Sequence, residues 1–157
     1  MINFRRLIQS LTNQLEDKQF DLIIGLSRGG LVPAVFLSHR FNVPVVVADI
    51  SHELSVGDNK DSHANILPVI PDNVKSILIV DDIIDSGNTI IALITNLKTT
   101  ATITVSALYL KDGAEEYLRN SLADTLHHGN IAGYFCAQQL PANSPFIYFP
   151  WEIAPTG

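Results

Sequence analysis

The stretch that decides the fold runs from Ile77 to Thr89 and reads ILIVDDIIDSGNT. Its first four residues form a continuous apolar run, which is typical of a strand buried on both faces of a sheet. Two adjacent carboxylates, Asp81 and Asp82, follow this run, and a loop of mostly small and polar residues ends the stretch. Apolar residues then recur at helical spacing, at Ile90, Leu93, Ile94 and Leu97. The stretch therefore predicts a buried strand, a polar loop and a helix in succession.

The same alternation of strands and helices continues on both sides of this stretch. Apolar residues at helical spacing predict further helices at residues 3–17, 31–41 and 114–127. Apolar and β-branched runs predict a buried strand at residues 43–50 and other strands at residues 22–26, 102–110, 134–136 and 146–149. Because strands that alternate with helices are joined by right-handed crossovers, this order predicts an α/β fold: a mainly parallel twisted sheet flanked by helices.

The composition of the 157 residues is that of a folded chain with few charges. Hydrophobic residues make up 46% and charged residues 17%, which excludes a disordered chain. The net charge of −6 disfavours binding to nucleic acid. Cys136 is the single cysteine, and no apolar run reaches the roughly 20 residues of a membrane span. We therefore expect one domain over residues 1–157, located in the cytoplasm, without a signal peptide, a disulfide or a membrane insertion.

Two loops lie where parallel sheets bind ligands, beyond the carboxyl ends of predicted strands. In the first, Ser27, Arg28 and two glycines offer backbone N–H groups and a forked positive charge to an anion. The second comprises residues 85–89, whose small and hydroxyl-bearing side chains before a helix suit a phosphate monoester. Ordinary capping of the helix explains the same residues in the second loop equally well, so both interpretations stay open.

Three carboxylates crowd the end of the central strand, at Asp81, Asp82 and Asp85. Because buried carboxylates repel one another, this cluster predicts a need for cations, hydroxyl donors or a proton. Neighbouring residues of a strand point to opposite faces, which predicts that Asp81 and Asp82 do not both touch one ligand. The sequence contains neither a P-loop nor a dinucleotide fingerprint, and its five histidines match no zinc spacing.

These residues resemble the type I phosphoribosyltransferases, and among them the bacterial xanthine-guanine branch. Residues 77–89 are similar to the family's motif of four apolar residues, two acidic residues and a phosphate loop. Residues 27–33, SRGGLVP, resemble the pyrophosphate loop of that branch. Residues 145–152, PFIYFPWE, resemble its C-terminal base-binding segment, which closes with Pro-Trp and an acidic residue. The three matches occur in the family's order along most of the chain.

The resemblance implies a role for each matching residue. Asp81 and Asp82 would bind the ribose hydroxyls of phosphoribosyl pyrophosphate (PRPP) and its Mg²⁺. Asp85 would also accept the proton from N7 of a purine. The 5′-phosphate would be held by Asp85, Ser86, Gly87, Asn88 and Thr89. Pyrophosphate would be held, in a loop of unusual peptide geometry, by Ser27, Arg28 and Gly29.

The base would lie in a C-terminal hood over residues 111–157, beneath a lid over residues 51–72. The resemblance implies that Lys111 donates to a 6-oxo group, that Phe146 stacks on the base and that Ile147 supplies a backbone contact. Two plainer interpretations are kept beside these: Phe146 as a core residue and Lys111 as a surface lysine. The carboxylate at Asp85 and the ammonium at Lys111 favour a 6-oxopurine.

The function implied is transfer of the phosphoribosyl group from PRPP to xanthine, guanine or hypoxanthine, by a dimer or tetramer. Three features depart from the xanthine-guanine branch: Asn88 in place of a second glycine, Ser51-His52 in place of a Ser-Tyr pair in the lid, and an extra segment between Lys111 and Tyr134. One alternative is a phosphoribosyltransferase for another base. The other is a regulator that senses PRPP and binds nucleic acid; such a protein should show a basic face, and the net charge of −6 with only ten Lys and Arg residues argues against it.

Overall fold

The computed structural model describes residues 2–50, 65–125 and 130–152. Its strands are β1 (Leu22–Leu26), β2 (Val45–Ala48), β3 (Ser76–Ile84), β4 (Thr102–Lys111) and β5 (Ile131–Leu140). Its helices are α1 (Phe4–Leu15), α2 (Leu31–Phe41), α3 (Asn88–Asn96) and α4 (Ala114–Leu122). The five strands form one sheet in the order β2-β1-β3-β4-β5, and every adjacent pair is parallel. The predicted α/β fold is therefore confirmed.

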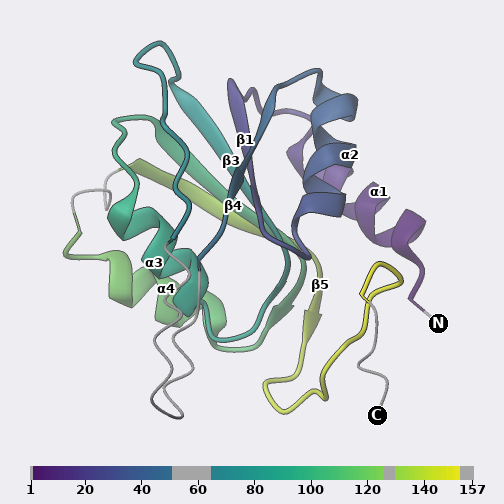
Figure 1. Cartoon of the computed structure of the whole chain (residues 1–157). Helices are drawn as coiled ribbons and strands as arrows, with labels where there is room; N and C mark the ends of the chain where they lie inside the picture. The colour runs from purple at the N-terminus through teal and green to yellow at the C-terminus, as the bar shows by residue number, and fades with distance from the viewer. Residues whose placement is uncertain (1, 51–64, 126–129, 153–157) are drawn as a thin grey trace, which may run out of the picture.

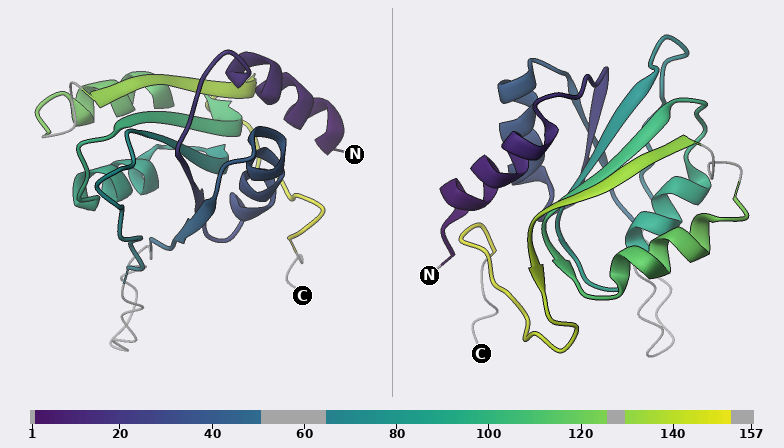
Figure 2. Two further views of the ribbon diagram at one scale, coloured as in Figure 1. Left: turned by 90° about the horizontal axis from the view of Figure 1, so that it is seen from above. Right: turned by 180° about the vertical axis from the view of Figure 1, so that it is seen from behind.

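The helices cover the sheet on both faces, α1 and α2 on one and α3 and α4 on the other (Figure 1). Alternate residues of β3 supply the two cores, because successive side chains of a strand point to opposite faces. Ile77 and Ile79 pack with α3 and α4, whereas Leu78 and Val80 pack with α1 and α2. Figure 2 shows the pronounced twist of the sheet between these two helical layers. The central strand is thus buried on both sides, as its apolar run predicts.

The central strand is longer than its apolar run. Strand β3 continues through both acidic residues, and Asp81 pairs with Ala107 of β4 and Ile84 with Leu110. Aspartate is unfavourable in strands, but the parallel ladder with β4 pairs the backbone of these residues and keeps them in the strand. Consequently the two carboxylates are fixed by the sheet itself, and the polar loop begins only at Asp85.

Two strand predictions are wrong, both at the margins of the sheet. The strand predicted as buried at residues 43–50 is the short edge strand β2, in which Val47 is 46% exposed. Residues 146–149 form no strand, and Phe149 packs against Tyr109 and Trp151 instead. The side chains of Ser10 and Gln14 donate hydrogen bonds to the carbonyls of Ala137 and Cys136 in β5, at 3.3 and 2.8 Å.

The segment after β5 packs through its aromatic rings instead. Phe149 is 2% exposed and its ring stacks on that of Trp151 at 4.7 Å. Trp151 in turn meets the edge of Phe4 in α1 at 5.2 Å, so this segment lies beside the start of the chain in both figures. The short strand predicted at residues 134–136 forms the middle of the longer, ten-residue strand β5.

The predicted lid and the extra segment are described only in part. Residues 51–64 of the lid lie outside the described residues, and residues 65–72 carry one antiparallel bridge, between Asp49 and Ile66. Helix α4 accounts for residues 114–122 of the helix predicted at 114–127. Within the described ranges no helix is long and apolar enough to cross a membrane.

Candidate active site

The loop between β3 and α3 has the backbone of an anion site. Gly87 precedes the first turn of α3 with a φ of +91°, a conformation that glycine adopts without strain. A hollow of about 390 Å³ opens at this loop, and its polar lining comes from Asp81, Asp85, Ser86 and Thr89. The first turn of α3 and the positive end of its dipole therefore face a space that can hold a phosphate.

Helix capping also occurs at this loop. The hydroxyl oxygen of Ser86 accepts a hydrogen bond from the N–H of Asn88 at 3.3 Å. Capping therefore accounts for the side chain of Ser86, while the start of the helix also borders the hollow. Asn88 is exposed as the first residue of the helix and does not line the hollow.

Helix α4 supports the loop from beneath. A Cβ added at Gly87 would lie 2.9 Å from the side chain of Leu118, which is fully buried. The extra segment that the sequence places between Lys111 and Tyr134 thus includes the residue on which the phosphate loop rests. Leu118 is a supporting residue that sequence reasoning missed; its place on the apolar side of a predicted helix was the only signal.

The loop after β1 faces Asp82. The peptide bond between Ser27 and Arg28 is cis, which confirms the unusual geometry predicted for this loop. The N–H of Ser27 donates to the carbonyl of Ala48 at 2.8 Å, and Arg28 is exposed. A Cβ at Gly29 would overlap the Asp82 carboxylate, so only glycine fits between this loop and the acidic strand. The two motifs of the sequence therefore meet in space.

The acidic pair lies in an unfavourable environment for two negative charges. Burial and the neighbouring Asp82 carboxylate hold the pKa of Asp81 well above its usual range. Burial also raises the pKa of Asp82, which is 7% exposed, and the charge of Glu152 adds to this effect. Asp81 lines the hollow at the loop after β3, whereas the Asp82 carboxylate lies against Gly29 in the loop after β1, as the alternation of side chains along a strand predicts. The pair is suited to a cation or to hydroxyl donors.

Asp85 and Lys111 form an ion pair. The Lys111 Nζ lies 3.0 Å from Oδ2 of Asp85, and the Lys111 side chain is only 11% exposed. The interpretation of Lys111 as a surface lysine is therefore wrong. Asp85 remains 69% exposed, so its carboxylate is held by the lysine and is still open to a ligand.

The C-terminal aromatic segment forms a separate, larger cavity of about 770 Å³ with the loop after β1. Phe146 is 68% exposed, which rules out its interpretation as a core residue. Its ring meets that of Tyr148, which is 57% exposed, edge to face at 4.7 Å. Arg28, Gly29, Trp151 and Glu152 complete the polar and aromatic lining.

The structure thus brings most of the expected site residues into three neighbouring contacts. Arg28 and Gly29 share a cavity with Phe146, Asp82 touches Gly29, and Lys111 pairs with Asp85. Ile147 is set apart from them, because its side chain packs in the core beneath α1 and α2. Lys111 does not line the cavity that contains Phe146.

Tyr148 and Trp151 are cavity residues that sequence reasoning assigned no role. Tyr148 lies two residues after Phe146, and that spacing places both side chains on one side of an extended chain. The indole nitrogen of Trp151 is buried and has no hydrogen-bond partner among the described residues.

Comparison with known proteins indicates the family of this chain. A family model described as a phosphoribosyl transferase domain matches residues 1–124. The xanthine-guanine phosphoribosyltransferase of Idiomarina loihiensis is 30% identical over 145 residues, which cover 89% of this chain and 76% of that protein.

Solved structures share the fold. The purine phosphoribosyltransferase of Pyrococcus horikoshii has a TM-score of 0.60 at 24% identity, covering 94% of this chain and 93% of that one. The xanthine-guanine-hypoxanthine phosphoribosyltransferase of Helicobacter pylori has a TM-score of 0.61 at 22% identity, with 85% and 80% covered. The chain belongs to the phosphoribosyltransferase family. Its resemblance to the xanthine-guanine branch is confirmed by the Idiomarina relative.

Proposed function

We propose that this protein transfers the 5-phosphoribosyl group from PRPP to a 6-oxopurine and releases pyrophosphate, as a reaction of purine salvage. The observation that carries the proposal is the 3.0 Å ion pair between Asp85 and Lys111 beside the phosphate loop. On a 6-oxopurine the N7 proton and the 6-oxo oxygen are neighbours, one a donor and the other an acceptor. A carboxylate and an ammonium side by side complement that edge, whereas the amino group of adenine would face a second donor in Lys111.

The two glycine-containing loops divide the phosphates of PRPP between them. Ser86, Gly87, Asn88 and Thr89 bind the 5′-phosphate through hydroxyl and backbone N–H groups at the start of α3. Ser27, Arg28 and Gly29 bind pyrophosphate at the other loop, where the guanidinium of Arg28 supplies the charge. The position of Gly29 against Asp82 supports this division, because it brings the pyrophosphate loop to the acidic pair.

The acidic pair fits Mg²⁺. No cluster of three His, Cys, Asp or Glu side chains suited to a metal occurs within the described ranges. Mg²⁺ is commonly bound by one or two carboxylates together with substrate phosphates and waters, which is the set that Asp81 and Asp82 offer with PRPP. When bound, Mg²⁺ neutralises charge on the leaving pyrophosphate. Asp81 and Asp82 also accept hydrogen bonds from the 2′- and 3′-hydroxyls of the ribose.

The transfer breaks the bond between C1 of the ribose and pyrophosphate and forms a bond from C1 to a ring nitrogen of the purine. Positive charge that develops on the ribose resembles an oxocarbenium ion. Asp85 accepts the N7 proton as the new bond forms, and Lys111 holds the 6-oxo oxygen. Catalysis then rests on positioning and preorganised charge, without a covalent enzyme intermediate.

The C-terminal segment holds the base from its face. Phe146 stacks on the purine, and Ile147 contributes a backbone contact to its edge. The exposure of Phe146 and its place in one cavity with Arg28 support this role. Family members form oligomers, and we propose a dimer or tetramer here, which size-exclusion chromatography with light scattering would measure.

A pyrophosphate-release assay with PRPP and Mg²⁺ tests the function. We expect turnover with at least one of xanthine, guanine and hypoxanthine, and little with adenine. Turnover of another base alone would assign the protein to a different branch. PRPP binding without turnover of any base would instead indicate a regulatory protein.

A further inference from the structure

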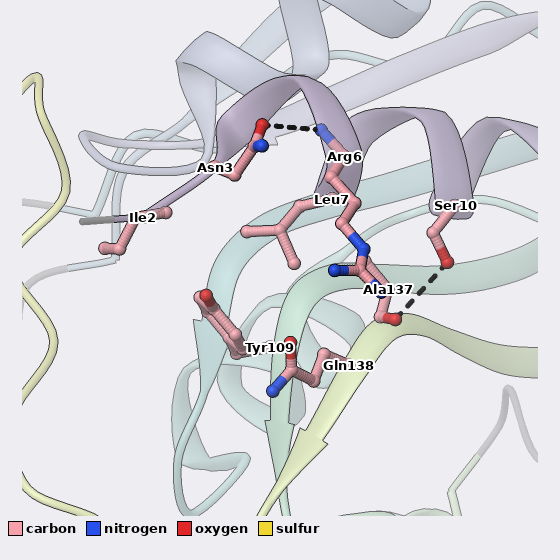
Figure 3. A pocket seen from close by; sticks show the side chains of 8 residues that line it. All are labelled: Ile2, Asn3, Arg6, Leu7, Ser10, Tyr109, Ala137 and Gln138. Carbon is pink, nitrogen blue, oxygen red and sulfur yellow. Dashed lines mark hydrogen bonds between the residues drawn. The ribbon is translucent and has the colours of Figure 1, made fainter.

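A cavity outside the proposed active site lies between α1 and the strands β4 and β5 (Figure 3). Its volume is about 780 Å³, within the roughly 300–1,000 Å³ range of small-molecule sites. Arg6 reaches it from α1, while Tyr109 and Gln138 come from adjacent positions of the two strands. None of these residues has a role in the proposed transfer reaction.

Tyr109 is the buried polar group of this cavity. The residue is 8% exposed, and its hydroxyl lies on the side of the ring that faces Ile2 and Leu7 (Figure 3). Burial raises the pKa of this tyrosine, so the hydroxyl stays protonated and can donate at neutral pH. A hydroxyl on the lining of a cavity can donate a hydrogen bond to a ligand bound there.

The remaining polar groups of the cavity are mostly donors. The Arg6 guanidinium has no ion pair within the described ranges, and the amide of Gln138 lies beside Tyr109 in the sheet. Asn3 uses its carbonyl oxygen to accept from the N–H of Arg6, which leaves its NH₂ group for the cavity. No carboxylate lines the space among the described residues. One fixed positive charge with several donors favours a ligand rich in acceptor oxygens.

The apolar side chains that line the cavity indicate that the ligand also has an apolar part. Ile2 and Leu7 form one wall, and the ring of Tyr109 lies below them (Figure 3). A flat ring fits against these groups better than a bare inorganic ion does. We propose that this cavity is a second binding site, specific for a phosphate monoester that carries a flat ring, such as a nucleoside monophosphate.

The number of sites for guanosine 5′-monophosphate (GMP), measured by equilibrium dialysis, tests the proposal. The active site itself is expected to bind GMP, so the intact chain should bind two molecules. Arg6→Gln should weaken binding at one of them by about 10-fold or more, the usual scale for a charged hydrogen bond. Arg5→Gln is the matched control, because Arg5 is an exposed neighbour in α1 that does not line the cavity. Tyr109→Phe should weaken the same site as Arg6→Gln.

The outcomes separate this proposal from the proposed function. One GMP site that Arg6→Gln abolishes would support the cavity and count against the active site. One site that Arg6→Gln leaves unchanged would overturn the cavity proposal and leave the active site intact. Equal weakening by Arg5→Gln, or equal occupancy of the cavity by uncharged guanosine, would also overturn it.

Discussion

Lys111 and Asp85 join the end of β4 to the start of the phosphate loop through a 3.0 Å ion pair with unequal exposure. The ammonium group is nearly enclosed, whereas the carboxylate is open to solvent. The lysine therefore fixes the carboxylate without consuming all of its acceptor positions, since a carboxylate has about four. A ligand can approach the pair from the side of Asp85.

Asp85→Asn tests the role of this carboxylate. The amide keeps the size of the side chain but cannot take up a proton, so we expect kcat to fall by about 100-fold or more, the scale of general acid–base catalysis. The affinity for PRPP should change much less. Asp124→Asn, an exposed carboxylate at the end of α4, is the control and should leave both values unchanged. Equal loss of turnover and PRPP binding would argue against the proton-accepting role.

Phe146→Ala tests the stacking role. Because base–aromatic stacking is worth about 1–3 kcal/mol, the KM for the purine should rise by roughly 10-fold while the KM for PRPP stays close to its original value. Thermal stability should hardly change, since the ring is 68% exposed. Tyr117→Ala, at a half-exposed ring on α4, is the matched control. A large loss of stability with an unchanged purine KM would assign the ring to packing instead.

Gly87→Ala and Gly113→Ala form a matched pair. Both glycines have positive φ values, +91° and +86°, so alanine strains the backbone at each by about 1 kcal/mol. A Cβ at Gly113 meets nothing within 4 Å, whereas one at Gly87 meets Leu118. We expect Gly87→Ala alone to raise the KM for PRPP, measured beside urea unfolding of both variants. Equal effects on PRPP would show that Leu118 does not support the loop.

The acidic pair predicts a dependence of stability on pH. Because the pKa of Asp81 is raised in the folded state, that state binds more protons than the unfolded chain. The free energy of unfolding should therefore fall as pH rises from the ordinary aspartate pKa of 3.8 through the raised value. Asp81→Asn should remove part of this dependence and raise Tm at pH 7.5 by about 3 °C, which corresponds to about 1 kcal/mol at this size.

The same variant should lose activity, because the neutral amide is a poor ligand for Mg²⁺. Asp21→Asn is unsuitable as a control, since Asp21 accepts hydrogen bonds from the N–H groups of Lys75 and Ser76. Asp112→Asn, at an exposed position after β4, is suitable. If calorimetry without Mg²⁺ finds Asp81→Asn less stable than the original chain at pH 7.5, then the negative charge of Asp81 beside Asp82 does not destabilise the folded state.

The sequence was sufficient to predict the parts of the fold that periodicity and apolar runs determine. Helix α2 spans the residues at which its helical spacing begins and ends, and β1 coincides with its apolar run. The parallel sheet followed from their alternation. Residues 146–149 were predicted as a strand because aromatic and β-branched residues favour strands, but Phe149 is held by ring contacts with Tyr109 and Trp151 and not by pairing with the sheet. These contacts join residues that are distant in the sequence, so the local residue pattern does not predict them.

The candidate site likewise has a part that the sequence predicts and a part that only the structure shows. Its motifs and their order could be found from residue types alone, whereas the contacts between them could not. The pairing of Asp85 with Lys111 depends on β3 and β4 lying side by side, and the fit of Gly29 against Asp82 depends on β1 lying next to β3. The role of Leu118 required knowing where α4 returns to the sheet.

The two hydrophobic cores on opposite faces of the sheet each anchor a different part of the candidate site. The phosphate loop is anchored in the core beneath α3 and α4, through Ile84, Ile90 and Leu118. The C-terminal segment, which we propose contacts the base, is anchored in the opposite core beneath α1 and α2, through Ile147 and Phe149. If the proposed function holds, mutations in the core beneath α1 and α2 can therefore alter the choice of base while binding of PRPP persists. A lineage with this architecture can diversify its acceptor substrates and still retain one common donor.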